Sequence, residues 1–556
     1  MRKFWKAHSH RVISSLAILA LVGIIIQSEG SRGLPNFFYF STSLPLWPKT
    51  STIGHGIAAR SGGGPPTIDP LVHSLAVIHN SSTLFKKEEK RQRTMMKLRD
   101  EIDKVLKGRK KDEKVKNIEE KLARARALIK EAMQGGRNNN HNSSISLEDI
   151  DYVPHGNIYK NAFAFHRSYL LMEKMFKIFI YEEGEPPLFH DGPYNNIYSL
   201  EGIFINSLEA HSHFRTKDPS QAHVFFLPFS VVMIIQTLFD PIVRDKAVLE
   251  RTIIDYIHVI ANKYPYWNRS LAADHFMLSC HDWVSTLLFK SIFVNPQFNG
   301  DLLQYLYMIA PNKTWAILWR AKASEFRPPL FALLMQGPRA TWYHPLLYFH
   351  SIRALCNANI SENFNPRKDA SIPEINLKPG EIPTLSPAIP ARERTNLAFF
   401  AGRMHGPIRP ILLKHWKGED KDIQVYDELP KTVSYDIMMK TSKYCLCPSG
   451  FEVASPRIVE AIYAECVPVL ISQSYVPPFS DVLNWDSFSV QVSVGDIPNL
   501  KRILMGIPYE KYLRMHKAVK QVQRHFLVNY PLKRYDVFHM IIHSIWLRRL
   551  NVGIHS

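Results

Sequence analysis

Residues 447–470, CPSGFEVASPRIVEAIYAECVPVL, combine a glycine turn, a Ser-Pro pair, one arginine and one glutamate. Gly450 permits a tight turn and a close approach of the backbone to a ligand. The pair Ser455-Pro456 is typical of the N-cap and first position of a helix, whose free N–H groups attract phosphate. Arg457 adds a positive charge, and Glu460 lies on the same helix face, where a carboxylate can bind a ribose diol. The segment predicts a nucleotide-diphosphate site, and a structural surface pair of Arg457 and Glu460 is the alternative.

A second basic turn occurs in FFAGRMHGPIRP, residues 399–410. An apolar run enters a glycine-containing turn that carries Arg403, His405 and Arg409. Arginine at the carboxyl end of a strand suits phosphate oxygens, which accept its forked donors. Two basic turns in one half of the chain favour an anion site over two unrelated surface loops.

Residues 273–283, ADHFMLSCHDW, place acids and histidines around an apolar run. A base that takes a proton from a sugar hydroxyl is a histidine or a carboxylate. Asp274, His281 and Asp282 are the candidates, and the last two follow the run. The alternative for the histidine is a core or loop side chain whose hydrogen bonds are satisfied.

The elements that must position these groups are apolar runs such as FKIFIY (176–181), AHVFFLPFS (222–230) and KYCLCPSG (443–450). Long apolar runs without alternation are typical of buried parallel strands. Two strand–helix series, separated by a proline-spaced connection, predict an α/β protein with two Rossmann-like domains facing a cleft. We expect one domain at 151–385 and a second, which includes the final helix, at 395–556.

The chain has 556 residues with 69 Lys and Arg against 50 Asp and Glu, a net charge of +19. Such a balance suggests anionic partners, nucleic acid among them. The N-terminus changes that expectation, because basic residues in 1–11 precede an apolar run that we assign to a signal anchor at 12–27. A cleaved signal peptide is the alternative. Either places the body in a lumen, which excludes nucleic acid as the partner.

The region 28–150 predicts a stem. Its Ser-, Gly- and Pro-rich part, 28–83, is a flexible linker, 84–134 is helical, and 135–150 is a second linker. The helical part is either a coiled coil or a helix that docks on the body, and we favour docking. Two D-x-D stretches, at 149–151 and 420–422, are interpreted as chance rather than as metal ligands.

Five cysteines leave at least one thiol unpaired in a monomer. Cys445 and Cys447 lie two apart in a strand-like run, and we interpret both as core residues. Glycosylation sequons agree with a luminal body. They lie at Asn80, Asn142, Asn268, Asn312 and Asn359.

Six blocks of the chain, in order, resemble plant exostosin-like glycosyltransferases of glycosyltransferase family 47. The resemblance covers about 150–283 and 344–550. The blocks are LFHDGPYNNIYSLEGIFINSLE, DPSQAHVFFLPFS, YPYWNRSLAADHFMLSCHDW, SIRALCNANISENFNPRKD, LAFFAGRMHGPIR and YCLCPSGFEVASPRIVEAIYAECVPVLIS. The resemblance implies a type II Golgi membrane enzyme with a GT-B fold that moves a sugar from a UDP-sugar to a cell-wall polysaccharide or proteoglycan. The branch that this chain resembles includes the xylogalacturonan xylosyltransferase.

By the same resemblance the second domain binds the UDP-sugar and the first binds the acceptor, with Asp274, His281 or Asp282 as base. The implied reaction is inverting, requires no metal cofactor, and can take place in a complex with other glycosyltransferases. The implied donor-site residues are Arg403, His405, Arg409, Ser449, Gly450, Arg457 and Glu460.

The chain departs from the family pattern in two places. Leu271-Ala272 stand where relatives commonly have two glycines, in a loop that can require positive φ. Residues 284–343 match nothing expected, and they are either a genuine insertion or intron sequence retained in a gene model, which we favour. The insert raises a second function, a catalytically inactive glycosyltransferase-like subunit that supports an active one.

Overall fold

The computed structural model describes residues 113–135, 152–240, 247–281, 344–380, 385 and 387–554. One compact unit holds the described residues from Asn117 onward. None of the helices in these ranges is long and apolar enough to cross a membrane. The predicted anchor at 12–27, most of the stem and the insert at 284–343 lie outside the described residues.

The first sheet has six parallel strands in the order β2-β1-β3-β4-β5-β6. Every residue of its four central strands is buried, as expected of a parallel sheet covered on both faces. The strands are β1 Ile178–Ile180, β2 Arg215–Thr216, β3 Val224–Phe226, β4 His275–Ser279, β5 Ile352–Leu355 and β6 Ala370–Ser371. The helices of this part are α4 Ala162–Met175, α5 Leu200–His211, α6 Val231–Leu238, α7 Ala247–Lys263, α8 Pro265–Ser270 and α13 Pro345–Phe349.

The second sheet has five parallel strands in the order β11-β10-β9-β7-β8. Two parallel sheets in one α/β chain fit a GT-B-like fold, so the predicted fold class is confirmed at this level. The strands are β7 Asn396–Ala401, β8 Ile423–Tyr426, β9 Ser442–Pro448, β10 Val467–Ile471 and β11 Val490–Val492. The helices are α14 Ile408–Trp416, α15 Tyr435–Thr441, α16 Arg457–Tyr463, α17 Leu500–Met505 and α18 Tyr509–Val522. Short 3-10 turns are η1 Pro219–Gln221, η3 Ile360–Glu362, η4 Ala391–Glu393, η5 Trp485–Ser487, η6 Val494–Asn499 and η7 Gln523–His525.

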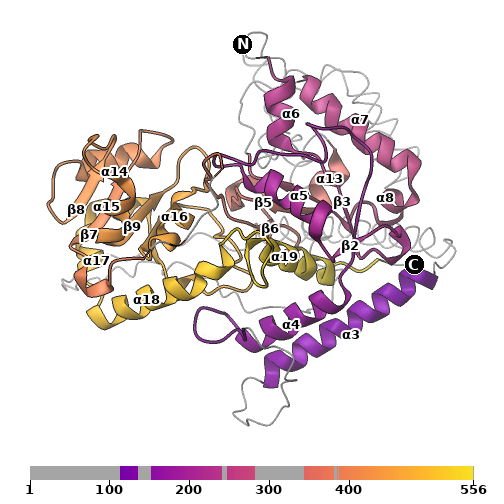
Figure 1. Cartoon of the computed structure of the whole chain (residues 1–556), viewed down its shortest axis with the longest axis horizontal. Coiled ribbons are helices and arrows are strands. Elements are labelled where there is room, and N and C mark those ends of the chain that lie inside the picture. Colours follow the sequence, from indigo (N-terminus) through magenta and orange to yellow (C-terminus); the bar gives the residue numbers. More distant parts are fainter. Residues whose placement is uncertain are drawn as a thin grey trace, which may run out of the picture. The chain divides into compact units, whose positions relative to one another are not determined.

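The final helix, α19 (Val537–Asn551), packs on β5, β6 and α4 of the first sheet (Figure 1). His543 bonds to the hydroxyl of Ser168 at 2.9 Å, and Arg549 Nε donates to the carbonyl oxygen of His223 at 2.7 Å. The expected domain division, which kept this helix with the second sheet, is therefore wrong at its end. The helix is buried on all sides, and such a helix carries no one-sided stripe that would indicate its partner.

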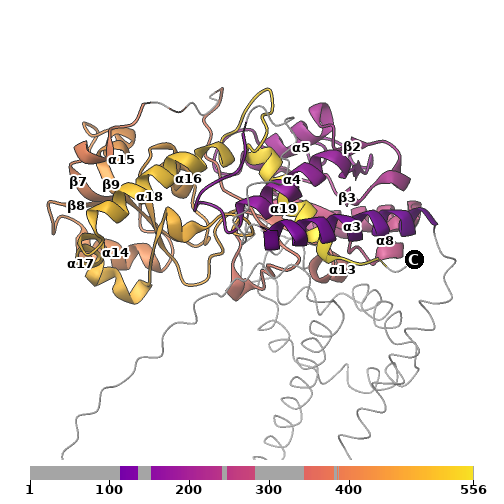
Figure 2. The ribbon, with the colours of Figure 1, turned by 90° about the horizontal axis from the view of Figure 1, so that it is seen from below.

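The stem helix α3 (Glu113–Gly135) docks on the body and lies beside α4 in both views (Figures 1 and 2). Its apolar stripe, which includes Leu122 and Ile129, is buried. Arg126 Nη1 donates to the carbonyl oxygen of Leu550 at 2.8 Å, and Glu119 forms an ion pair with Arg549. Of the two interpretations of this segment, the structure supports docking.

Two disulfides join Cys280 to Cys356 and Cys445 to Cys466. Cys445 is buried in the core, as interpreted, but its disulfide with Cys466 was not predicted. Cys447 is a free, buried thiol, as expected. Burial raises the pKa of Cys447 to about 12, so this thiol is uncharged at neutral pH.

The two sequons in the described residues differ in exposure. Asn268 is exposed on α8. Asn359 is only 7 % exposed, and its amide oxygen accepts hydrogen bonds from Ser361 Oγ at 2.7 Å and Ser474 Oγ at 2.5 Å. A glycan on Asn359 does not fit this folded environment. Asn80, Asn142 and Asn312 lie outside the described residues.

The loop before β4 keeps the backbone conformation that favours glycine. Leu271 has φ +50° and Ala272 has φ +66°, both in the left-handed region. A side chain in that region costs about 1–2 kcal/mol per residue. The chain therefore preserves the turn and carries the strain that glycines would avoid.

Candidate active site

A cavity of about 1010 Å³ opens at the carboxyl ends of β7 and β9. Parallel α/β sheets bind ligands at this edge, beside the loops that follow the strands. The turns after both strands, the helices α15 and α16, and the segment after β6 line the cavity. The lining residues used below are Glu374, Asn376, Arg403, His405, Arg409, Tyr435, Gly450, Glu452, Arg457 and Glu460.

Glycines interlock the two basic turns. Gly406 has φ +74°, and a Cβ there would lie 2.2 Å from the carbonyl carbon of Gly450. A Cβ on Gly450 would in turn lie 2.5 Å from His405 Nδ1. The backbone N–H of Phe451 donates to the same His405 nitrogen at 3.3 Å. The predicted close approach at Gly450 is therefore made by the neighbouring turn, and it sets the shape of the cavity wall.

Arg409 and Arg457 carry buried N–H groups that find no acceptor among the described residues. Arg457 Nη2 donates to the carbonyl oxygen of Ala401 at 2.8 Å, and its guanidinium lies 4.6 Å from the centre of the Phe400 ring. Its Nε and Nη1, and Nε of Arg409, are buried without a hydrogen-bond partner in the described part of the chain. Buried donors are rarely left unpaired in native proteins. Three such donors in one cavity indicate a place for a ligand with several acceptor oxygens.

The two guanidinium groups also repel each other. Burial and then the charge of Arg457 lower the pKa of Arg409 to about 10, so Arg409 stays protonated at neutral pH. A bound anion would relieve this repulsion, because an opposite charge favours the protonated form. Arg403 lies at the exposed edge, 3.8 Å from Glu428.

Glu460 is held by neutral donors. Tyr435 donates its hydroxyl to Oε2 of Glu460 at 3.0 Å, and Asn376 Nδ2 donates to Oε1 at 3.3 Å. Arg457 points to Ala401, and no ion pair joins it to Glu460 among the described residues. The structural surface pair considered for Arg457 and Glu460 is therefore not formed.

Two serines predicted from the motif have other roles. Ser449 is 5 % exposed and donates its hydroxyl to the carbonyl oxygen of Val453 at 2.8 Å, which closes the β9–α16 turn. Helix α16 begins at Arg457 with Pro456 as N-cap and without a side-chain cap, so the predicted cap at Ser455 is wrong by one residue.

The structure separates the predicted bases. Asp274 lies at the amino end of β4, 1 % exposed; its carboxylate accepts a hydrogen bond from Ser270 Oγ at 2.5 Å and lies 2.9 Å from His275 Nδ1. Burial opposes its ionisation, but His275 and then Arg269 outweigh burial and lower the pKa of Asp274 to about 2. His281 follows the opposite end of β4, with its ring 4.8 Å from that of Tyr198. Asp282 lies outside the described residues.

Two carboxyl groups in the cavity were not predicted from the sequence. Glu374 is 2 % exposed and follows β6, within the stretch interpreted as an interdomain connection. Glu452 lies in the β9–α16 turn, 3.4 Å from the hydroxyl of Tyr198. A sequence signal for Glu374 was available, because this acid lies inside the mostly apolar run SIPEI, and an acid in such a run is unusual for a linker.

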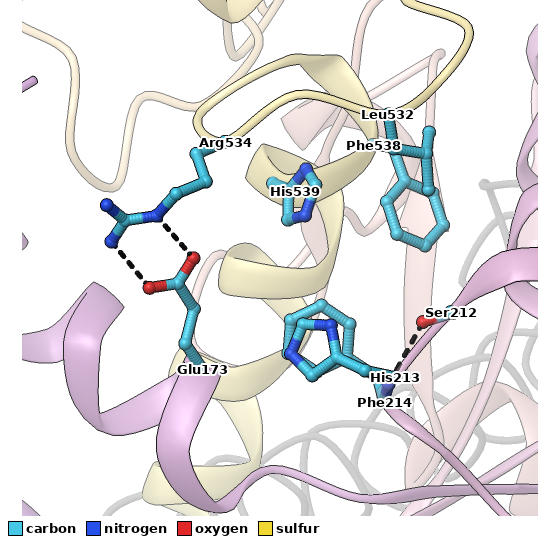
Figure 3. Close-up of a pocket in the computed structure, with 8 residues that line it drawn as sticks. All are labelled: Glu173, Ser212, His213, Phe214, Leu532, Arg534, Phe538 and His539. Carbon is cyan, nitrogen blue, oxygen red and sulfur yellow. Dashed lines mark hydrogen bonds and ion pairs between the residues drawn. The ribbon is translucent and has the colours of Figure 1, made fainter. Parts of the chain in front are cut away.

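A smaller depression of about 370 Å³ lies between α4, the α5–β2 loop and the start of α19 (Figure 3). Arg534 lines it, but Nε and Nη2 of this arginine already donate to Glu173 at 2.8 and 2.6 Å. Burial lowers the pKa of His213, which also faces this space. With its cation neutralised, the depression offers an anion less than the larger cavity does.

The described residues contain no group of three or more His, Cys, Asp or Glu side chains that could hold a metal ion. The D-x-D acids Asp420 and Asp422 both form ion pairs with Lys501, at 2.6 and 2.8 Å. The other D-x-D stretch, at 149–151, falls outside the ranges described.

Comparison with known proteins relates this geometry to a family. Residues 172–293 and 335–507 match the Exostosin GT47 domain, and the break between them falls inside the stretch 284–343. A probable glycosyltransferase of Arabidopsis thaliana, At3g07620, is 56 % identical over 79 % of this chain and 81 % of its own length. A second, At5g03795, is 52 % identical over 79 % of this chain and 73 % of its own. A probable glucuronosyltransferase of Oryza sativa subsp. japonica, Os01g0926400, is 27 % identical over 62 % and 72 %.

Proposed function

The chain belongs to the exostosin GT47 family and is a glycosyltransferase, and from this premise we propose that it transfers a sugar from a UDP-sugar to a cell-wall polysaccharide or proteoglycan. The observation that carries the proposal is the set of three buried arginine N–H groups without acceptors in the cavity. A diphosphate supplies acceptor oxygens in the number and charge that these donors require. The second sheet is then the donor-binding part.

Each cavity residue has a role in this proposal. Arg409 and Arg457 bind the diphosphate and stabilise the charge that grows on the leaving UDP. Arg403 and His405 lie at the edge, where they meet the phosphate or the transferred sugar. Glu460 accepts hydrogen bonds from the ribose diol, for which Tyr435 and Asn376 hold its carboxylate in place.

The proposed reaction is an inverting displacement in one step. The acceptor oxygen forms a bond to the anomeric carbon while the bond from that carbon to the phosphate oxygen breaks and its electrons leave with UDP. The acceptor proton passes to a base beside the cavity. Arginine charge serves the leaving group here, so the proposal includes no metal.

We place the body in the Golgi lumen, with residues 12–27 as the membrane anchor of a type II protein. Two disulfides support an oxidising compartment, because cytosolic proteins rarely keep them. The exposed sequon at Asn268 agrees with that compartment. For the donor sugar we propose xylose, arabinose, galactose or glucuronic acid, and for the acceptor a pectin or hemicellulose.

The test is calorimetric titration of the luminal chain with UDP, followed by a panel of those UDP-sugars with pectic and hemicellulosic oligosaccharides. We expect UDP binding that R457M or R409M weakens at least tenfold, because each removes a charged hydrogen-bond donor worth about 1.5–3 kcal/mol. The control is R502M, an exposed arginine on α17. A wild-type chain that binds no UDP would refute the proposal.

A second function has one observation in its favour. The family match breaks between residues 293 and 335, and the break begins about eleven residues after Asp282. A chain that binds UDP but transfers no sugar across the whole panel would be the inactive subunit of a complex with another glycosyltransferase.

A further inference from the structure

Two carboxyl groups from different sheets meet in the cavity. Glu374 lies three residues after β6, and its backbone is fixed because Ile375 pairs with Tyr198 and accepts a hydrogen bond from Ser199 Oγ at 2.7 Å. Glu452 lies in the β9–α16 turn, where its carbonyl oxygen accepts the N–H of Gly450 at 3.0 Å. Both side chains line the cavity, and they are close enough that Glu452 raises the pKa of Glu374.

Glu374 has a buried carboxyl oxygen without a hydrogen-bond donor among the described residues. Glu374 is only 2 % exposed, and its Oε1 makes no hydrogen bond within the described residues. A buried acceptor without a donor costs about 1–3 kcal/mol unless a ligand or water supplies one. A sugar hydroxyl in the cavity is such a donor.

The charges around the pair favour one proton between its members. Burial and then Glu452 raise the pKa of Glu374 well above its usual range, with Arg409 opposing and Glu460 adding to the shift. The phenols of Tyr198 and Tyr475 face the pair and stay neutral, since burial raises the pKa of each. Two neighbouring carboxyl groups that raise each other's pKa do not both ionise readily.

The proton belongs on Glu374 and the charge on Glu452. Glu374 is fully buried, and burial disfavours the charged form. Glu452 is only half-buried and receives the hydroxyl of Tyr198 at 3.4 Å, which favours its charged form. One carboxylic acid beside one carboxylate, in a cavity, is an arrangement suited to acid–base chemistry.

We propose that Glu452 is the base that accepts the proton of the acceptor hydroxyl, and that Glu374 positions it. This inference rests on the proposed glycosyltransferase function. The acceptor O–H bond breaks and its proton moves to a Glu452 oxygen, while the acceptor oxygen bonds to the anomeric carbon and UDP leaves with the electrons of the broken bond. Glu374 keeps its own proton, which it donates to Glu452, and its free Oε1 accepts a second sugar hydroxyl.

The carboxyl pair fits this role better than the bases predicted from sequence do. Glu374 and Glu452 line the same cavity as Arg409 and Arg457, whereas His281 and Asp274 are not among its lining residues. Asp274 is also closed in by Ser270 and His275 at the other end of β4.

The test compares E452Q and E374Q with E510Q, which changes an exposed glutamate on α18. UDP affinity is measured by calorimetry, and turnover by UDP release from the UDP-sugar panel with and without oligosaccharide acceptors. We expect UDP affinity within about threefold of wild type in all three variants. E452Q should lose at least about 100-fold in kcat, as expected for loss of a general base, and sodium formate should restore part of the activity of E452A.

E374Q has a different expected signature. Glutamine keeps the donor and the acceptor of a protonated glutamate, so we expect E374Q to lose much less kcat at neutral pH than E452Q does. Wild type should lose activity as pH rises and Glu374 ionises beside Glu452, whereas E374Q should not show that alkaline decline. A merely structural role for Glu374 predicts no difference between the two pH profiles.

Several results would overturn the inference while the proposed function survives. They are unchanged kcat in E452Q, equal loss in E452Q and E374Q, or loss of UDP affinity with unchanged kcat. A wild-type chain that binds UDP but neither transfers nor hydrolyses any donor would overturn it too. Failure of wild type to bind UDP would refute the proposed function itself, and the inference with it.

Discussion

The contact between the two glycine turns allows a sharp test with the substitution G406A. The position has φ +74°, so a side chain costs about 1–2 kcal/mol of backbone strain. The new Cβ would also lie 2.2 Å from the carbonyl carbon of Gly450. The clash is with backbone atoms, which cannot rotate out of the way as the end of a flexible side chain can. The β9–α16 turn must therefore shift, at a further cost of about 1–3 kcal/mol. We expect a lower thermal midpoint and UDP affinity reduced at least tenfold, because that turn carries Arg457.

The control is G418A, which shares the strain but not the contact. Gly418 has φ +75°, and a Cβ there would meet nothing within 4 Å. Its cost is therefore the strain alone, about 1–2 kcal/mol, with UDP affinity unchanged. Differential scanning fluorimetry and calorimetric UDP titration of the two variants, side by side, isolate the effect of the contact. Equal UDP affinity in G406A and G418A would refute the argument that interlocked turns shape the donor site.

Four further predictions concern single residues. E460A should weaken UDP binding about 10–100-fold in a calorimetric titration, since a charged acceptor is worth about 1.5–3 kcal/mol; unchanged affinity would contradict the ribose role. L271G should raise the urea midpoint, gaining up to about 1 kcal/mol from relief of its φ of +50°, and a lower midpoint would contradict the strain. N268Q should remove one glycan by gel mobility in the secreted luminal chain, whereas N359Q should leave the mobility unchanged; the reverse pattern would show that Asn359 is accessible. Burial raises the pKa of Glu250 to about 7, so Glu250 costs no free energy of unfolding below pH 4.5, where it is protonated in both states. That cost grows as pH rises through 7, so E250Q, which stays neutral, should unfold about 1–3 kcal/mol less readily than wild type between pH 4.5 and 8 in urea unfolding.

Much of the donor site could be predicted from local patterns. Apolar runs without alternation indicated the parallel strands, because burial on both faces leaves no polar side to a strand. Arg409, Arg457 and Glu460 follow such runs directly, and the edge of a parallel sheet gathers whatever follows its strands. These residues could be found because chain position alone brings them to the cavity.

The remaining features depend on contacts between distant parts of the chain. Glu374 is an ordinary acid in the sequence, and only burial opposite Glu452 makes it chemically distinct. Cys445 on β9 forms a disulfide with Cys466, which immediately precedes β10, the neighbouring strand, and spacing in the sequence does not indicate this pairing. Ser449 was expected to bind phosphate, but it satisfies a carbonyl group within its own turn.

The position of α19 has a consequence for how the chain is made. The strands of the first sheet are synthesised well before α19, the helix that covers β5 and β6. About 180 residues separate β6 from the end of α19, which at ~5–20 residues per second is about 10–40 s of translation. Throughout that interval the sheet presents the surface that Trp546 and its neighbours later bury. The first sheet should therefore remain a chaperone client until α19 has emerged, and a nonsense codon before α19 should destabilise this sheet rather than the donor site.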